Sequence, residues 1–417
     1  MRPLHHYCLA TGTWFAAHGV QGVMFAWLVT MVLHETPQMV GVAQMAMLVP
    51  VMLLMLFGGG VADALGGRRI AILAQSFAVV PSIGLLLVLA FDALDFRLMI
   101  IYAVAMGCAT AFVTPARDGL LNLVAEGRIQ RTVTLVSLIQ FGVQMVGFTV
   151  AGLAGRIGPL AVIGFQTAVL IVGAVAYTRL PAPPVRSVVM PSLRELVGSV
   201  VEGSQTVLRS DSMRPVVVQN IAMGICFMGS YIVAMPLLVR EVYQGDAADL
   251  SMVMIANALG LVTSILLLLL GGGLRRQGRA LLLAHFLGCI FLGAAGLDFG
   301  FWAAIACIYL WGACGGVAMS MSRTIMQEAA PDGQRGRVMA FFSFSFMGAG
   351  PLGALIAGYL VGWVGPPIAL FISSATLMVV IVAVALTSSL WNMTADAFLA
   401  TSRSETPRAD EPRQAAG

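Results

Sequence analysis

The sequence carries very little charge. Only 10% of its 417 residues are charged, whereas soluble globular proteins carry about 25%. Lysine is absent, so all 23 basic residues are arginine. With 59% apolar residues and a mean hydropathy of +0.92, the chain cannot cover its surface with polar groups. This composition excludes an ordinary soluble protein and indicates a surface that largely faces lipid.

Motifs for catalysis, metal binding and redox chemistry are also missing. The six cysteines are scattered through apolar stretches without C-x-x-C spacing, which indicates small buried side chains. H-E-x-x-H, G-x-S-x-G and phosphate loops ending in G-K-S/T do not occur. The arginines form no basic face of the kind that binds nucleic acid. We therefore expect no enzyme activity, no cofactor, no metal ion and no nucleic-acid partner.

Hydrophobic stretches long enough to span a membrane recur along the chain. A spanning helix needs about 20 mostly apolar residues, and the first stretch is too long for a signal peptide. Breaks at charged or Pro/Gly clusters predict twelve spans: 7–33, 38–62, 70–91, 98–116, 132–155, 159–179, 214–239, 250–273, 279–297, 300–322, 338–363 and 367–391. The sequence therefore predicts an all-α membrane protein with twelve transmembrane helices.

These spans group into two six-helix bundles with a polar connection between them. The bundles are expected at 1–180 and 214–391, with a cytoplasmic linker at 181–213 and a disordered tail at 392–417. Residues 192–209 place apolar side chains at helical spacing beside charges, which predicts a short helix at the membrane interface. We favour a tether between the bundles over a partner-binding site for this helix.

The arginines give the predicted topology a direction. All but three of them (Arg97, Arg156 and Arg240) fall on the side that holds both termini. Short loops rich in Arg mark the cytoplasmic side of a membrane protein. The sequence therefore predicts a multi-pass protein of the bacterial inner membrane with both termini in the cytoplasm.

An internal repeat relates the two halves. A shift of 206 residues aligns five identities, Arg117 with Arg323, Arg131 with Arg337, Gly142 with Gly348, Gly147 with Gly353, and Gly152 with Gly358. Together with Gly350 and Pro351, these glycines are expected where helices approach one another closely. Duplicated halves of a transporter hold the substrate between them near the bilayer midplane. The repeat therefore predicts a substrate site and alternating access by rocking of one half against the other.

The stretch from Gly59 to Arg69 resembles the loop signature of the major facilitator superfamily. Gly59, Asp63, Gly66, Arg68 and Arg69 match its pattern, whereas Ala64 and Gly67 stand where basic residues are common. The segment 22–50, and Arg335–Ala340 leading into 350–353, look like the enterobactin-exporter and macrolide-efflux branch. This resemblance implies twelve helices in two pseudo-symmetric bundles and export of siderophores, drugs or other amphiphiles by proton antiport.

Charged residues at the cytoplasmic helix ends are candidates for a conformational gate. Asp63 is expected to act as a latch that holds the outward-facing state, the alternative being a solvated loop carboxylate. Arg117, Asp118 and Arg131 correspond to Arg323 and Arg337 in the other half. These groups are interpreted either as an ion-pair network or only as topology signals. We give the two interpretations equal weight, and they are compatible.

Polar residues within the spans are candidates for the transport cavity. His18 and Gln21 share one face of the first span, and His18 is a candidate proton carrier or a hydrogen-bonded structural residue. No Asp or Glu lies at mid-depth, which weakens the expectation of proton antiport. The remaining cavity candidates are amides that either orient a substrate or hold helices together, the second role being favoured: Gln44, Gln140, Gln144, Asn220 and Asn257.

These observations favour a secondary transporter that exports small amphipathic molecules, with the proton as the expected coupling ion. A metabolite importer with the same fold is an alternative, because the motifs do not specify direction. A transport-inactive membrane sensor or scaffold is a second alternative. The 25 methionines suit a pocket that adapts to varied apolar shapes. The expected partners are a small-molecule substrate, the lipid bilayer and the proton, and the protein is expected to be a monomer.

Overall fold

The computed structural model describes residues 3–124, 129–181, 193–271, 274–331 and 333–393. All regular secondary structure in these ranges is helical. The first half consists of α1 (Pro3–Trp27) with η1 (Leu28–Val32), α2 (Pro37–Leu65), α3 (Gly67–Ala90), α4 (Phe96–Val124), α5 (Ile129–Gly152), α6 (Ala154–Ile157) and α7 (Pro159–Thr178). The linker helix is α8 (Leu193–Arg209).

The second half begins with a single crossing built from four consecutive helical segments. These are α9 (Met213–Met223), η2 (Gly224–Met228), η3 (Ser230–Ala234) and α10 (Met235–Glu241). The half continues with α11 (Ala247–Leu270), α12 (Gln277–Ala295), α13 (Phe301–Ala329), α14 (Arg335–Met347), α15 (Gly350–Thr387) and η4 (Ser389–Asn392). The π-helical turns of η2 and η3 widen this crossing locally, as π-bulges do at many functional sites.

The described chain crosses a membrane-sized slab twelve times. Eleven of its helical segments are long and apolar enough to cross, and the last one, Arg335–Thr387, has 53 residues. At 1.5 Å per residue this segment would be about 80 Å long, far more than the bilayer's hydrocarbon core of about 30 Å. Its backbone breaks at Gly365 (φ 78°, ψ 163°), just before Pro366 and Pro367. The segment therefore makes two crossings, and the predicted number of helices is confirmed.

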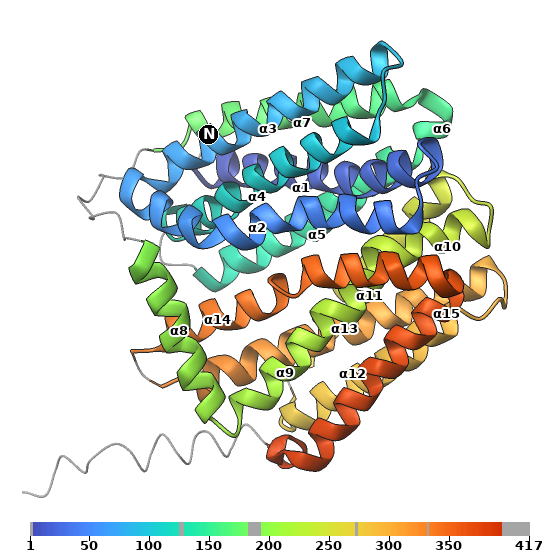
Figure 1. Ribbon diagram of the computed structural model, residues 1–417. Helices are drawn as coiled ribbons and strands as arrows, with labels where there is room; N and C mark the ends of the chain where they lie inside the picture. The colour runs from blue at the N-terminus through green and yellow to red at the C-terminus, as the bar shows by residue number, and fades with distance from the viewer. Residues whose placement is uncertain (1–2, 125–128, 182–192, 272–273, 332, 394–417) are drawn as a thin grey trace, which may run out of the picture.

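The helices pack into two layers that correspond to the two halves (Figure 1). In the first half α1 packs on α5 and α7, while α4 lies between α2 and α3. In the second half α13 lies between α11 and α12, and α12 also packs on α15. The main contacts between halves join α2 to α15 and α5 to α11.

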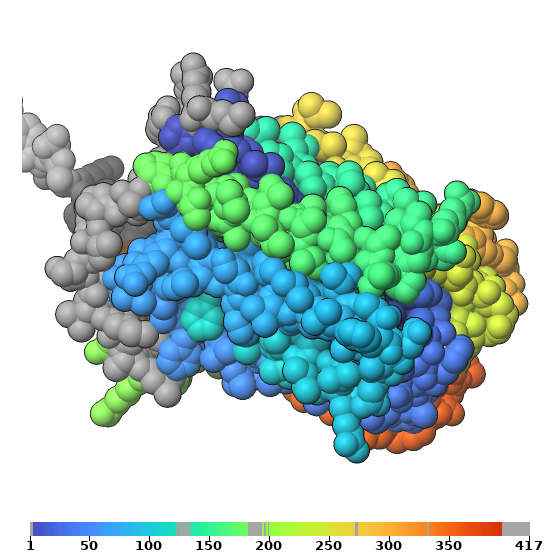
Figure 2. Space-filling view, turned by 90° about the horizontal axis from the view of Figure 1, so that it is seen from above, coloured from blue at the N-terminus to red at the C-terminus, as the bar shows by residue number. Residues whose placement is uncertain are grey.

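The outer surface is apolar. On α3 the exposed side chains include Leu73, Phe77 and Val80, and on α7 they include Ile171 and Val175. Figure 2 shows this face, which α3 and α7 cover over most of its length. A soluble protein rarely exposes such a continuous apolar area. The natural solvent of this surface is lipid.

We name the two ends of the bundle by their arginines. The arginine-rich end carries Arg68, Arg117, Arg209, Arg323 and Arg337, and it lies at the left in Figure 1, where α8 is seen. The arginine-poor end carries the three exceptions noted above. At the arginine-rich end α2, α4 and α13 extend beyond the predicted spans, because they run on to Leu65, Val124 and Ala329.

This extension changes the structural setting of the loop signature. Gly59 and Asp63 lie within α2, and Gly66 alone forms the turn before α3 begins at Gly67. Gly66 has φ 92° and ψ 122°, a backbone conformation that glycine adopts without the clash of a Cβ atom. The signature is therefore the end of a helix and a sharp turn rather than an extended loop.

The glycines aligned by the repeat differ in what surrounds them. A Cβ atom on Gly147 would overlap the carbonyl oxygen of Ala16 in α1, and one on Gly353 would lie 2.5 Å from the carbonyl oxygen of Ile225. Glycines at these positions therefore permit close helix packing. The expectation is wrong for Gly142, where a Cβ atom would meet nothing within 4 Å.

The other predicted packing positions vary in the same way. A Cβ atom on Gly152 would lie 2.8 Å from Ser251, and one on Gly358 would lie 2.9 Å from the Cα atom of Gly41, so both glycines permit contact between the halves. Gly348 lies close to Phe344 of the preceding helix, and Gly350 makes only ordinary contacts. Pro351 is buried at the start of α15.

Candidate functional site

A cavity of about 450 Å³ lies against the second half and is closed on one side by Met55 of the first half. Its remaining walls come from six elements of the second half, namely α9, η2, η3, α11, α13 and α14. The lining residues are Met55, Asn220, Met223, Phe227, Met228, Tyr231, Asn257, Leu261, Trp311, Gly312, Gly315, Met319, Ser322, Arg323, Phe342, Ser343, Phe346 and Met347. The volume is that of a site for a drug-sized molecule.

The cavity wall is mainly aromatic and methionine side chains. Trp311 packs edge-on against Phe227, with ring centroids 5.3 Å apart at 87°, and against Tyr231 at 6.1 Å. Five methionines complete much of the remaining wall. Methionine is flexible and polarisable, so it adapts to apolar ligands of different shape. The wall is suited to an apolar or aromatic molecular body.

A few polar groups enter this wall. The amide nitrogen of Asn220 donates to the carbonyl oxygen of Phe342 at 3.0 Å and to the hydroxyl of Ser345 at 2.7 Å, which fixes its orientation. Asn257 is half-buried and faces the cavity from α11. Arg323 is exposed, and among the described residues of the lining it is the only charged one.

A second hollow continues from the cavity toward the arginine-rich end. It has a volume of about 350 Å³ and shares Met55, Ser343 and Met347 with the cavity. Gly59 and Pro115 of the first half line one side, and residues of α14 line the other. The two hollows together leave a space between the halves on this side of the cavity.

The halves are tightly joined at the opposite, arginine-poor end. The Gly41–Gly358 contact brings α2 and α15 together, with a Cβ atom on Gly41 only 2.7 Å from the carbonyl oxygen of Ala354. Nearby, the amide of Gln44 donates across the halves to the carbonyl oxygen of Ile232 at 3.1 Å. The hydroxyl of Ser251 donates to the carbonyl oxygen of Phe148.

Arg240 strengthens this closed end, a role that was not predicted from the sequence. Its guanidinium donates to the carbonyl oxygens of Thr30 at 2.9 Å and Glu35 at 3.0 Å in the first half, and it pairs with Glu241 at 2.5 Å. The signal available in the sequence was its rarity, since it is one of three arginines on this side. The described residues therefore join the halves tightly at the arginine-poor end and leave hollows between them toward the other end.

Arg117 and Arg323, which the repeat aligns, have different surroundings. Arg117 is buried within the first half, pairs with Asp118 at 2.8 Å and lies 4.8 Å above the ring of Phe15. The hydroxyl of Tyr7 donates to its carbonyl oxygen at 3.1 Å. Arg323 has no ion-pair partner among the described residues. Among the described residues, no ion pair joins Arg117 or Asp118 to the second half, and the side chain of Arg131 lies outside them, so the predicted ion-pair network stays a prediction.

Asp63, the predicted latch of the outward-facing state, is exposed, and no described residue forms an ion pair with it, so the latch stays a prediction. Arg68 instead donates to the last carbonyl oxygens of α7, to Tyr177 at 3.2 Å and to Thr178. Basic side chains stabilise helix C-termini in this way. Arg69 is exposed, so the basic residues of the signature here serve the first half alone.

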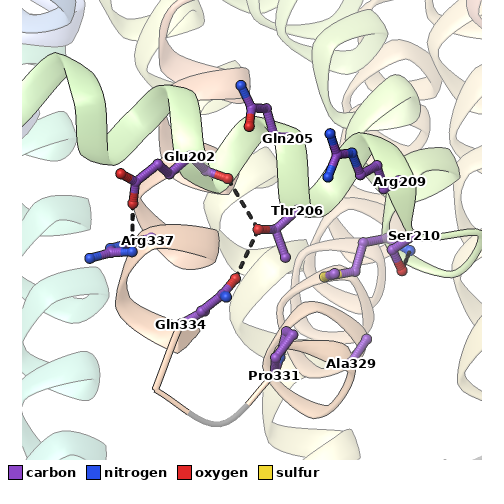
Figure 3. A pocket seen from close by; sticks show the side chains of 10 residues that line it. Glu202, Gln205, Thr206, Arg209, Ser210, Ala329, Pro331, Gln334 and Arg337 are labelled. Atoms are coloured by element: carbon purple, nitrogen blue, oxygen red, sulfur yellow. Dashed lines mark hydrogen bonds and ion pairs between the residues drawn. The ribbon is translucent and has the colours of Figure 1, made fainter.

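The linker helix α8 is docked on α14, as Figure 3 shows. Glu202 of α8 pairs with Arg337 at 2.5 Å, and the hydroxyl of Thr206 donates to the side-chain oxygen of Gln334 at 2.8 Å. A Cβ atom on Gly203 would lie 2.5 Å from the carbonyl oxygen of Arg337. Arg337 therefore holds the linker in this state. The side chain of its counterpart Arg131 lies outside the described residues. Residues 182–192 of the predicted linker and 394–417 of the predicted tail also lie outside them.

Of the seven cavity candidates, Asn220 and Asn257 line the cavity. Gln21 donates to the sulfur of Met47 at 3.3 Å, and Gln44 joins the halves, so both act between helices. Gln140 and Gln144 lie half-buried on α5. His18 is half-buried on α1, and its Nδ1 atom is buried without a hydrogen-bond partner.

A histidine that was not predicted from the sequence lies behind the cavity wall. The Nδ1 atom of His285 is 2.9 Å from the side-chain oxygen of Gln219, and its Nε2 atom is 3.0 Å from the sulfur of Met223. Each ring nitrogen therefore has an acceptor beside it to which its N–H can donate, according to the tautomer, which is typical of a structural histidine.

Comparison with known proteins decides the family. The profile of a family described as transmembrane secretion effector matches residues 8–415. The chain belongs to this family. It is a membrane transporter of the major facilitator type, as the loop signature and the repeat predicted, and not an enzyme.

Individual relatives agree with this assignment. A staphyloferrin A transporter of Staphylococcus aureus (strain NCTC 8325 / PS 47) is 25% identical over 363 residues, covering 84% of this chain and 86% of that protein. A solved nucleoside transporter has a TM-score of 0.72 at 12% identity and covers 93% of this chain and 99% of its own. A POT family transporter in complex with 5-aminolevulinic acid has a TM-score of 0.74 at 12% identity, and the match covers 94% of this chain and 96% of that transporter. At such identities the two structures show the shared fold.

Proposed function

We propose that this transporter exports small amphipathic molecules by alternating access. The observation that carries the proposal is the cavity, whose wall combines Trp311, Phe227 and five methionines with the polar groups of Asn220, Asn257 and Arg323. An apolar pocket with a few placed polar groups is the usual form of a small-molecule site. A single chain contributes both halves, so we propose that the monomer is the transporting unit.

The two ends of the bundle support alternating access. The halves are joined at the arginine-poor end, while hollows between them extend from the cavity toward the other end. If the arginine-rich end lies in the cytoplasm of a bacterial cell, as the distribution of Arg indicates, this state loads substrate from the cytoplasm. Rocking the halves about the cavity would then release it on the far side of the inner membrane.

Export and proton coupling are supported by different observations. The family description names secretion, and the relative from Staphylococcus aureus is named for transport of staphyloferrin A. For coupling, His18 is an ionisable side chain inside a span with an unpartnered ring nitrogen, and ionisable residues in spans are commonly functional. No acidic side chain occurs among the described residues that line the cavity, so His18 is the proposed proton carrier.

Transport into everted membrane vesicles tests the proposal. Vesicles would be given a proton gradient and a panel of labelled siderophores, macrolides and cationic and anionic dyes. We expect at least one compound to accumulate, and a protonophore to abolish the accumulation. Trp311→Ala should reduce uptake while leaving membrane insertion intact, and Phe299→Ala, at an exposed site away from the cavity, is the matched control.

Other outcomes identify the alternatives. Accumulation that ignores the protonophore would remove proton coupling. Uptake only into right-side-out vesicles would favour an importer. No transport of any compound, together with an unchanged phenotype in Asp63→Asn, would favour a sensor or scaffold.

A further inference from the structure

We propose that the substrate is an organic anion with an apolar or aromatic body, and that Arg323 binds its acidic group. This inference rests on the proposed function and adds a substrate class to it. It follows from the charge of one cavity residue, from the comparison of that residue with its counterpart in the other half, and from the shape of the surrounding wall.

Arg323 is placed to meet a ligand. It lies in α13, six residues before the helix ends at Ala329, and its exposed side chain lines the cavity. The described part of the lining contains no Asp or Glu, and no described residue forms an ion pair with Arg323. Arg323 lies one residue beyond the predicted span 300–322, at the arginine-rich end of the cavity, where its exposed guanidinium can pair with the acidic group of a ligand.

The internal repeat provides a comparison within the same chain. In the first half, the residue after Arg117 is Asp118, which neutralises that arginine at 2.8 Å. In the second half, the residue after Arg323 is Thr324, whose hydroxyl donates to the carbonyl oxygen of Ser320 at 2.9 Å. The duplicated position therefore keeps its arginine but lacks the adjacent acid. The charge that is cancelled in one half is left available to the cavity in the other.

A purely topological role does not account for this placement. Arg275, on the same end of the second half, is exposed in a connection outside the cavity, where it suffices as a topology signal. Arg279 lies over the ring of Trp391 and donates to its carbonyl oxygen. Arg323 differs from both because its charge faces the cavity.

The rest of the wall sets the shape of the anion. The mutually perpendicular rings of Trp311 and Phe227 form an aromatic corner, with Tyr231 beside them. Guanidinium groups form paired hydrogen bonds with carboxylates, sulfonates and phosphates. An apolar or aromatic body in this corner and an acidic group on Arg323 would satisfy the two parts of the cavity together. An amphipathic cation would be repelled by Arg323, the one charged side chain in the described part of the lining.

The test compares two probes that differ in charge alone. Tritiated 1-naphthaleneacetate and 1-naphthaleneacetamide share one ring system and nearly one volume. Binding to the full-length protein in phosphatidylcholine nanodiscs is measured by equilibrium dialysis, with empty nanodiscs subtracted. We expect the acid to bind about tenfold more tightly than the amide, since a charge-assisted hydrogen bond contributes at least this much. Added salt should weaken binding of the acid more than binding of the amide.

Five variants test the roles of Arg323 and of the aromatic wall. Arg323→Gln and Thr324→Asp, the second of which restores the acid seen in the first half, should each abolish the preference for the acid. Arg323→Lys should retain part of it. Arg275→Gln makes the same charge change outside the cavity and should leave it unchanged. Trp311→Ala should weaken both probes.

The results separate this inference from the proposed function. Equal binding of both probes, or a preference that survives in Arg323→Gln, would overturn the anion assignment while leaving the cavity as an amphiphile site. Binding of neither probe would also overturn it, and vesicle transport would then decide on the proposed function independently.

Discussion

At the residue scale, Arg117 and Arg323 show how a duplicated side chain acquires two roles. Arg117 is buried against Phe15 and paired with Asp118, so it belongs to the packing of the first half. Arg323 contacts a cavity instead. Sequence alignment of the halves predicted equivalence, and it could not reveal this difference, because the burial of Arg117 depends on α1, which the aligned segment does not include.

This contrast predicts different effects on stability. Arg117→Gln removes the stacking on Phe15 and leaves Asp118 unpaired, so we expect the free energy of unfolding to fall by about 1–2 kcal/mol. Asp118 is largely exposed, which keeps the loss modest. Arg323→Gln should leave stability nearly unchanged. The measurement is the midpoint of thermal unfolding in detergent, and equal midpoints for the two variants would contradict the difference in burial.

The histidines give a second prediction at this scale. His18 has an unpartnered ring nitrogen, whereas both nitrogens of His285 have partners. We expect His18→Phe to abolish the pH dependence of transport, because His18 is the proposed proton carrier. His285→Asn should lower stability but keep the pH profile. An unchanged profile in His18→Phe would end its role as proton carrier.

At the element scale, hydropathy and arginine placement predicted the number and order of the crossings. Both signals are properties of whole helices, since a span must be apolar along about 20 residues. Helix ends were less predictable, because α2, α4 and α13 continue into polar sequence beyond the hydrocarbon region. The cavity was harder still. Gln44 and Asn257 are both amides inside spans, and only the packing of neighbouring helices decides which one meets another helix and which one faces a cavity.

Two glycines of α5 provide a prediction about helix packing. A Cβ atom on Gly147 would overlap the backbone of α1, whereas one on Gly142 would meet nothing within 4 Å. We expect Gly147→Ala to destabilise the protein by about 1–3 kcal/mol through overpacking. Gly142→Ala should be neutral or stabilise it by up to about 1 kcal/mol, because alanine favours the helix. Thermal unfolding of both variants measures this, and a loss in Gly142→Ala equal to that in Gly147→Ala would refute the packing argument.

At the scale of the whole molecule, the two halves are separate packing units that meet at one end. Each half buries its helices mainly against its own members, and the joining contacts include the Gly41–Gly358 approach, the Gly152–Ser251 contact, the amide of Gln44, and Arg240. Close packing of glycines stabilises a contact without requiring large apolar side chains. Such a contact can separate without exposing a large hydrophobic surface, as a rocking motion requires.

Filling the glycine contact should therefore hold the arginine-poor end open. Gly41→Val places a side chain where even a Cβ atom would lie 2.7 Å from the carbonyl oxygen of Ala354. We expect faster amide hydrogen exchange at the start of α2, residues 38–45, and at least a tenfold loss of transport, with substrate still bound. Gly350→Ala on α15, whose nearest neighbour would be a flexible Leu48 methyl group at 3.4 Å, is the control and should transport normally. Unchanged exchange and normal transport in Gly41→Val would mean that closing this end is not part of the transport cycle.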